Sequence, residues 1–249
     1  MEKAQEPGQP VAGVAAPLGT WRATDRWRPG RAGTASGGRG VECVETGEVG
    51  FCKTVNVAQE KICSDLAREV GVKVPEARLG TLEGHGGVVV VSLVHGKESL
   101  DLSMLQSRDA ALYGSTEVQH AIRAASGLLP FYTWAAITDF KDDHLVIGEE
   151  GGGYAVAAID FASSLQWANP DEAVQFLGGH PALLLQPDAQ VIAATVQKIE
   201  ALPEQTIEGI VNSIPDAVFS ATEKDRVIRG LRFRRSGVRE VMHQKGWLP

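Results

Sequence analysis

The sequence predicts an α+β fold in which a strand-rich N-terminal part is followed by a helix-rich C-terminal part. Two observations predict it. Before residue 98, short runs rich in valine alternate with glycine and turn residues, and one helical pattern interrupts them. From residue 99 onward, most of the chain has helical periodicity, with prolines at the breaks. We therefore expect a loose tail over residues 1–19, a first lobe over 20–98 and a second lobe over 99–249.

The first lobe is expected to hold strands, one helix and then further strands. Residues 57–70 place apolar side chains on one helical face, and Gly71 is a typical residue to end that helix. Residues 87–94 are a continuous apolar run, which is typical of a strand buried on both faces. The expected strands are 41–45, 48–54, 77–82 and 87–94, with a hairpin turn at Thr46-Gly47 between the first two.

The second lobe is expected to be helical except for one hairpin. Two helical patterns occupy residues 99–136, and the second, over 118–134, contains Pro130, which should kink or end it. Short strands at 145–147 and 155–159 flank a glycine-rich turn. The C-terminal helices are expected over 191–202, 204–214 and 223–245, with Pro203 and Pro215 at the breaks.

Charge and cysteine content exclude several classes of protein. The formal net charge is -7, whereas a sequence-independent nucleic-acid binder needs a basic surface to displace counterions from phosphates. We therefore expect no nucleic-acid partner, and we interpret the arginines near residues 229–235 as a solvated helix face. The three cysteines have no CxxC spacing, which indicates buried free thiols in a reducing compartment rather than a zinc site or a disulfide framework.

The distribution of apolar residues indicates no membrane partner. Glu2, Lys3 and Glu6 precede only a short apolar stretch, so no signal peptide is expected. The longest apolar runs, 86–94 and 122–137, are too short or too interrupted to cross a bilayer. We expect a cytoplasmic protein, and no pattern in the sequence predicts its oligomeric state.

The chemistry-bearing residues lie on either side of the expected hairpin. Asp139 and His144 are five residues apart on one loop, and Asp160 follows them across a strand, a glycine turn and a strand. This layout places acidic groups at the two ends of one hairpin, where they can face each other. Phosphoryl transfer needs such an arrangement: a carboxylate that orients the attacking hydroxyl, ligands for Mg²⁺, and a cation on the nucleotide phosphates.

Three segments resemble the protein-kinase-like superfamily. The run from Asp139 through Lys141 and His144 to Ile147 resembles the Asp-Leu-Lys-x-x-Asn catalytic loop of eukaryotic-type protein kinases, and Ile159-Asp160-Phe161 resembles their metal-binding Asp-Phe motif. The segment from Glu60 to Gly71-Val-Lys-Val-Pro75 is similar to HipA-like and phosphatidylinositol-kinase-like members. The order and spacing of these motifs over residues 41–245 favour a small bacterial HipA-like kinase.

The resemblance implies a role for each residue and implies ATP and Mg²⁺ as cofactors. Asp139 would be the catalytic carboxylate, Lys141 would lie beside the transferred phosphate, and Asp160 would bind the metal. His144 stands where the family has Asn as a metal ligand. Neutral imidazole suits softer metals than Mg²⁺, so the substitution raises the alternative of Mn²⁺.

Lys53 is the candidate for the lysine that holds the nucleotide phosphates. It ends an expected strand just before a helix, and Glu60 at the start of that helix is its candidate ion-pair partner. The alternative is that Lys53 is an exposed strand lysine and Glu60 an acid favoured by the helix dipole. The glycine-rich segment 30–40 could cover the phosphates through Gly37 and Gly38, or it could be a linker.

The leading hypothesis is therefore an ATP-dependent kinase that phosphorylates a hydroxyl on a protein or a small molecule. The second is a pseudokinase that binds nucleotide or a partner without turnover, for which His144 is the main argument. In a third alternative, Asp139 and Asp160 are turn residues of an α+β protein that binds no nucleotide.

Overall fold

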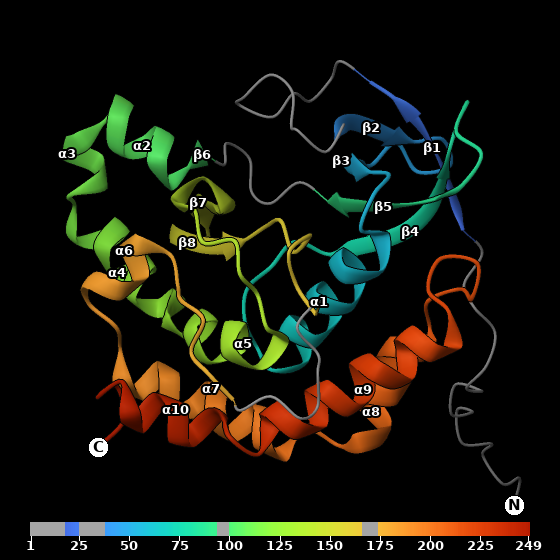
Figure 1. The fold of residues 1–249 in the computed structure, drawn as a ribbon. Helices are drawn as coiled ribbons and strands as arrows, with labels where there is room; N and C mark the ends of the chain where they lie inside the picture. Colours follow the sequence, from blue (N-terminus) through green and yellow to red (C-terminus); the bar gives the residue numbers. More distant parts are fainter. Residues whose placement is uncertain (1–17, 25–37, 94–99, 166–173) are drawn as a thin grey trace, which may run out of the picture.

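The computed structural model describes residues 18–24, 38–93, 100–165 and 174–249. Its strands of residues 19–93 lie to one side of the molecule, and most of its helices lie to the other (Figure 1). The strand-rich and helix-rich parts therefore follow one another in space as they do in the sequence, and the observed mixture of helices and strands confirms the α+β class. Among the described residues, no helix is long and apolar enough to cross a membrane.

A closed five-stranded barrel forms the N-terminal part. Its order is β1-β2-β3-β5-β4; β1 runs parallel to β4, and every other neighbouring pair is antiparallel. Trp21, Val41 and Cys52 belong to the apolar cluster of these strands. The strands are β1 (Gly19–Ala23), β2 (Arg39–Cys43), β3 (Val49–Lys53), β4 (Ala77–Leu82) and β5 (Val88–Leu93).

Strand β5 is buried on both faces, as the continuous apolar run predicts. Val89 and Val91 belong to the barrel cluster, whereas Val90 packs with Val57 and Ala77 on the opposite face. Successive side chains of a strand point to opposite faces, so only a run without polar residues can fill both environments.

Helix α1 (Val57–Glu69) connects the barrel to the helical part of the molecule. Ile62 and Leu66, one turn apart, are fully buried in the large apolar cluster of the helical part. Gly71, with φ 74°, follows the last turn, and the N–H of Val72 donates to the carbonyl of Ala67 at 2.8 Å. The helix therefore ends on a left-handed glycine, as the sequence predicts.

The second sheet is a three-stranded sheet that carries the predicted hairpin. Its order is β6-β7-β8, with antiparallel pairing throughout, from β6 (Leu100–Asp101), β7 (Leu145–Glu150) and β8 (Gly153–Ala158). Gly151 and Gly152 make the turn with φ of 61° and 83°. Because both residues need the left-handed region, glycine is the residue that fits there.

Helix α5 (Leu128–Ala135) lies in the large apolar cluster of the C-terminal part, and every residue in it is buried. Pro130 is the third residue of α5, where a missing N–H costs little, and a short 3-10 segment, η1 (Ala125–Gly127), separates α5 from α4 (Thr116–Ala124). The others are α2 (Leu102–Arg108), α3 (Ala110–Tyr113), η2 (Asp142–His144), α6 (Pro181–Leu185), α7 (Ala189–Ala201), α8 (Glu204–Asn212), α9 (Ala221–Arg235) and α10 (Val238–Gln244).

The structure differs from the sequence-based expectations in four places. Strand β1 and the short helix α6 are present but were not expected. The single helix expected over 223–245 is divided between α9 and α10 at Ser236 and Gly237. The arginine cluster is not wholly a solvated helix face. Arg234 is only 7% exposed, and its Nε donates to the carbonyl of Trp134 at 2.6 Å.

Candidate functional site

A buried lysine lies between two acidic side chains from distant parts of the chain. Lys53, the last residue of β3, is 5% exposed, and its Nζ forms an ion pair with Glu60, which is 3% exposed in the first turn of α1. The same Nζ lies 2.9 Å from Oδ1 of Asp160, which follows β8. The ion pair expected from the sequence is therefore present, and the alternative of an exposed strand lysine is wrong.

Burial and charge act in opposite directions on this cluster. Burial favours the neutral form of Lys53, but Glu60 and Asp160 outweigh it and raise the pKa of Lys53 above its ordinary value. Burial likewise favours the neutral acid at Asp160, but Lys53 outweighs it and holds the pKa of Asp160 below its usual value. Burial raises the pKa of Glu60, against the attraction of Lys53. We assign the ionised form to Glu60 because its carboxylate contacts the ammonium directly.

These charges leave the cluster short of positive charge. Among the described residues, one ammonium forms ion pairs with two carboxylates, which leaves an excess of one negative charge at the cluster when both acids are ionised. A bound cation would balance it, because a buried charge without a partner is costly.

The backbone at Asp160 turns sharply out of strand β8. Asp160 has φ 65°, a left-handed conformation that costs about 1–2 kcal/mol for a residue other than glycine. The N–H of Ile159 donates to the carbonyl of His144 at 2.9 Å, and the N–H of Ala162 donates to Oδ1 of Asp160 at 3.4 Å. Such backbone strain is characteristic of functional sites, where surrounding contacts hold it in place.

Asp139 and Lys141 form a second, more exposed group. Nζ of Lys141 lies 2.8 Å from Oδ2 of Asp139, and 59% of the Lys141 side chain and 33% of the Asp139 side chain are exposed. The hydrogen bond from Lys141 to Asp139 raises the pKa of Lys141. The N–H of Thr138 donates to the carbonyl of Ser163 at 3.1 Å, which ties this loop to the segment after Asp160.

His144 lies beside Asp160, as the alignment of the loop predicts. Its Nε2 is 3.9 Å from Oδ2 of Asp160 and 3.8 Å from Oδ1 of Asp143. Its Nδ1 is buried, and no described residue hydrogen-bonds to it. Buried ring nitrogens are normally satisfied, so Nδ1 needs a partner that the described residues do not supply.

The residues present fit a divalent cation that a nucleotide helps to bind. Within the described ranges, no group of three or more His, Cys, Asp and Glu side chains could hold a metal ion. Mg²⁺ is usually held by one or two carboxylates and by the phosphates of the substrate, and Asp160 supplies such a carboxylate. His144 adds a nitrogen donor, which suits Mn²⁺ better than Mg²⁺.

The glycine-rich candidates are only partly described. Gly37 lies outside the described residues. Gly38 is half-buried and directly precedes β2, which is antiparallel to β3, the strand that carries Lys53. Its contact with phosphates therefore stays a prediction.

Sequence reasoning missed two residues that adjoin the site. Nε2 of His180 lies 2.7 Å from the hydroxyl of Tyr132, and both residues are 1% exposed. The ring of His180 meets that of His144 edge-on, with 6.5 Å between centroids. Burial lowers the pKa of His180 to about 4. No metal-ligand spacing marks His180 in the sequence, so the sequence alone gives no reason to select it.

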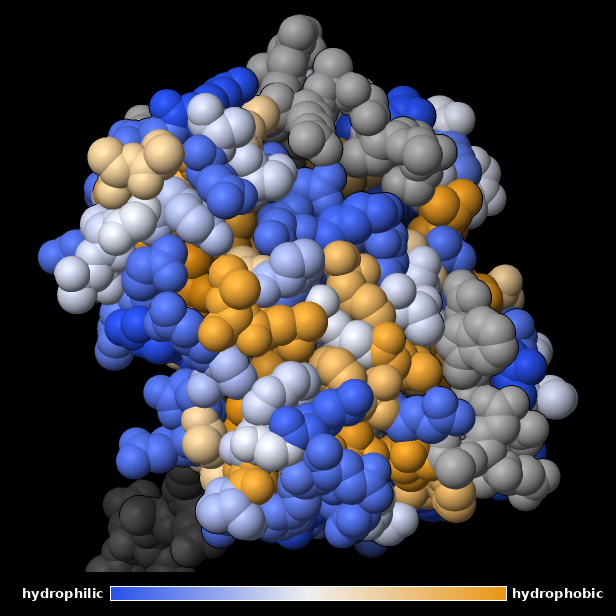
Figure 2. Space-filling model, turned by 60° about the vertical axis from the view of Figure 1, so that its left-hand side comes forward, coloured by the Kyte–Doolittle hydropathy of each residue, from blue (hydrophilic) through white to orange (hydrophobic). Residues whose placement is uncertain are grey.

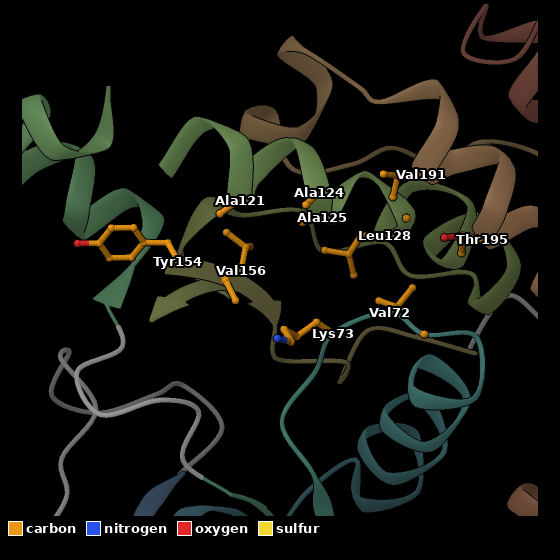
Figure 3. Close-up of a pocket in the computed structure, with 13 residues that line it drawn as sticks. Val72, Lys73, Ala121, Ala124, Ala125, Leu128, Tyr154, Val156, Val191 and Thr195 are labelled. Atoms are coloured by element: carbon orange, nitrogen blue, oxygen red, sulfur yellow. The ribbon is translucent and has the colours of Figure 1, made fainter. Parts of the chain in front are cut away.

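A cavity of about 230 Å³ lies apart from these residues, between α4, α7, β8 and the end of α1 (Figure 3). Its walls include Ala121, Ala124, Val156 and Thr195, and none of the site residues predicted from the sequence lines it. Small side chains leave this space where helices meet the sheet. The cavity is therefore separate from the candidate site.

Exposed apolar side chains lie near the loop of Asp139. Figure 2 turns α4 and α6 forward and shows apolar surface in the middle of that face. Leu177, Leu184 and Leu185 are large apolar residues with 41%, 40% and 77% exposure in and just before α6. The N–H of Ala182 in this helix donates to Oδ1 of Asp142 at 3.3 Å, so α6 adjoins the loop of Asp139.

Comparison with solved structures supports the same fold. The structure is similar to that of CtkA, a proinflammatory kinase of Helicobacter pylori, with a TM-score of 0.58 and 17% sequence identity over 83% of this chain and 93% of that chain. A weaker likeness, with a TM-score of 0.47 and 14% identity over 94% and 76% of the two chains, is to HipA of Shewanella oneidensis in complex with HipB and operator DNA.

The likeness to CtkA shows the fold of this chain. No family model matches the sequence, and no curated protein matches it. The similarity to the Helicobacter pylori kinase shows that this chain has a protein-kinase-like fold, which confirms the resemblance predicted from the motifs at the level of the fold.

Proposed function

We propose that this chain is an ATP-dependent phosphotransferase that transfers the γ-phosphate of ATP to a hydroxyl group. The observation that carries the proposal is the buried contact of Lys53 with both Glu60 and Asp160. The end of β3, the first turn of α1 and the segment after β8 meet at this contact, in a fold similar to that of a kinase. Asp160 also takes a left-handed backbone at this place.

The nucleotide would lie between the barrel and the helical part, which act as the two lobes over residues 20–98 and 99–249. Lys53 would hold the phosphates, and Glu60 would fix the position of its ammonium group. Asp160 and His144 would hold the divalent cation, which when bound neutralises charge on the phosphates. Gly37 and Gly38 would approach the phosphates from the start of β2.

Asp139 would orient the acceptor hydroxyl. The hydroxyl oxygen forms a bond to the γ-phosphorus, the bond from that phosphorus to the bridging oxygen of ADP breaks, and the hydroxyl proton passes to Asp139. Lys141, now paired with Asp139, would turn its ammonium toward the transferred phosphate. Both side chains are partly exposed, so they can change partner without breaking a buried contact.

The acceptor hydroxyl belongs to a protein or to a small molecule. The exposed leucines of α6 favour a protein acceptor, because they form an apolar surface that adjoins the loop of Asp139. A small-molecule acceptor would not need this surface.

The second candidate function is that of a pseudokinase, and His144 is the observation that favours it. If its ring does not bind the metal, Asp160 is left with one protein ligand fewer for the cation than the family pattern has. The chain would then bind nucleotide or a partner without turnover.

The test is the incubation of the purified protein with γ-labelled ATP and either Mg²⁺ or Mn²⁺, with Asp139→Ala as the control. A kinase releases ADP and transfers label to an acceptor in the lysate, and mass spectrometry identifies the modified residue or molecule. Nucleotide binding without either product would support the pseudokinase. The absence of both binding and turnover in a folded protein would contradict both functions.

A further inference from the structure

We propose that His180 is a positioning residue that holds the His144 ring in its orientation toward Asp160. The inference deepens the proposed phosphotransferase function and rests on it. Four observations on residues 178–182, which we name the brace, support it.

The backbone of the brace lies directly against the catalytic loop. Gly178 has φ 145°, and a Cβ atom added there would lie 2.5 Å from the Phe140 ring, next to Asp139. A Cβ atom added at Gly179 would lie 2.6 Å from Leu129 of α5. Neither position accepts a side chain without displacement of its neighbour. The two glycines therefore allow the close approach of the brace to the loop.

The first side chain after the glycines is His180, and its ring is fixed from one side. Its Nε2 is 2.7 Å from the Tyr132 hydroxyl, and the two ring centroids are 5.2 Å apart. Tyr132 belongs to α5, in which every residue is buried. A buried hydrogen bond between two ring systems in a packed core leaves little freedom to either ring.

On its other side the His180 ring reaches the candidate metal site. Its edge contact with the His144 ring has an interplanar angle of 74°, and Nε2 of His144 lies 3.9 Å from Oδ2 of Asp160. A continuous series of contacts thus runs from Tyr132 through His180 and His144 to Asp160. The rotation of His144 is limited by His180 rather than by a hydrogen bond of its own Nδ1, which has no partner among the described residues.

The brace makes one further connection to the same loop. The N–H of Ala182, in the first turn of α6, donates to Oδ1 of Asp142 at 3.3 Å. Asp142 begins η2, and His144 ends it. The brace therefore contacts the loop at Phe140, Asp142 and His144. These three contacts hold the loop along most of its length.

Tyr132→Phe tests the inference with the smallest change, because it removes the hydroxyl and keeps the ring. Tyr154→Phe is the matched control, since Tyr154 lies on β8 and contacts no residue of the brace in the described contacts. Two quantities are measured for each variant: the NMR signals of the His144 ring, assigned with His144→Asn, and kcat and KM for ATP. His180→Gln is a second variant, which keeps a polar group of similar size.

We expect Tyr132→Phe and His180→Gln to shift the His144 ring signals. We also expect them to lower kcat by up to about a hundredfold with KM for ATP unchanged, because misplacement of a catalytic group by about 1 Å can cost about that much. Tyr154→Phe should change neither. The inference is overturned if the His144 signals in both Tyr132→Phe and His180→Gln match those of the wild type while the proteins are folded. If the signals shift but the wild type shows no phosphotransfer, the positioning role stands and the proposed function fails.

Discussion

The two charged groups of the candidate site differ in how they are held. Lys53 and Glu60 are 5% and 3% exposed, whereas the side chains of Lys141 and Asp139 are 59% and 33% exposed. Burial fixes the positions of Lys53 and Glu60 before any ligand binds. Their charged groups have lost contact with water, so each is stabilised by the ion pair with the other. The second group is solvated, and its ion pair contributes little to stability.

This difference assigns separate tasks to the two groups. A preformed buried cluster suits the binding of phosphates and metal, because every nucleotide molecule presents these charges in the same arrangement. A solvated pair suits the acceptor, because Asp139 must exchange Lys141 for a hydroxyl group. Substitutions in the buried group should therefore change stability and nucleotide affinity, and substitutions in the exposed group should change turnover alone.

The largest expected effect is on turnover. Asp139→Asn removes the carboxylate that we propose as the acceptor of the hydroxyl proton, and it should lower kcat by about 10²- to 10⁴-fold. Nucleotide affinity and the unfolding temperature should be unchanged, because Asp139 belongs to the exposed group. Steady-state kinetics and calorimetry measure these quantities. Asp225→Asn, at an exposed ion pair with Arg229, is the control; a loss of stability in Asp139→Asn alone would contradict the comparison.

The next effect is on stability. Lys53→Met leaves Glu60 buried without its partner, which should cost about 3–5 kcal/mol of unfolding free energy. Lys73→Met removes the exposed pair with Glu150 and should cost about 0–1 kcal/mol. Urea unfolding measures both. Addition of Glu60→Leu to Lys53→Met should restore part of the loss, and equal costs for the two lysines would remove the distinction between buried and exposed groups.

A third effect depends on pH and concerns His180. Its pKa is about 4 in the folded protein, below the ordinary 6.5, because burial disfavours the charged ring. The unfolded chain therefore binds more protons between these values, so the contribution of His180 to stability is complete above the ordinary pKa and is lost as the pH falls toward about 4. The slope is up to about 1.4 kcal/mol for each pH unit.

Urea unfolding at pH 7 and pH 5 should show a larger loss for the wild type than for His180→Gln. His144 and Asp139 act on the His180 ring in the wild type, and both remain in place in His180→Gln. Equal losses in the two proteins would show that His180 is not neutral and buried.

The smallest effect is on metal preference. His144→Asn replaces a nitrogen donor with an amide oxygen, which the hard Mg²⁺ prefers. We expect the ratio of Mg²⁺- to Mn²⁺-dependent turnover to rise by about fivefold, or roughly 1 kcal/mol. The ratio is measured in the same preparation with each metal. An unchanged ratio would show that His144 does not face the metal, although it lies beside Asp160.

Much of the candidate site was predictable because its motifs are short and local. Lys53 and Glu60 are separated by one strand-to-helix connection, and His144 and Asp160 lie at the two ends of one hairpin. Strand pairing brings the two ends of the hairpin together, and the short connection from β3 to α1 brings Glu60 close to Lys53. The β7–β8 hairpin and the buried strand β5 were predicted for the same reason, since each follows from a local pattern of apolar and glycine residues.

The features that escaped prediction depend on contacts between distant segments. Strand β1 has few apolar residues, and it is a strand because it pairs with β2 and with β4. The single helix expected over 223–245 has no proline at its break, but Gly237 stands there, and glycine is a common residue at helix ends. His180 reaches His144 from the far side of the hairpin, and no spacing in the sequence marks that approach.

Calorimetric titration of Mg·ATP into the wild type, Asp139→Asn and Asp160→Asn tests the central claim most directly. The claim is that the cluster of Lys53, Glu60 and Asp160 binds the metal nucleotide, while Asp139 serves the acceptor. The account predicts equal affinity in the wild type and Asp139→Asn, and loss of metal-dependent binding in a folded Asp160→Asn. Unchanged Mg·ATP affinity in Asp160→Asn would contradict it.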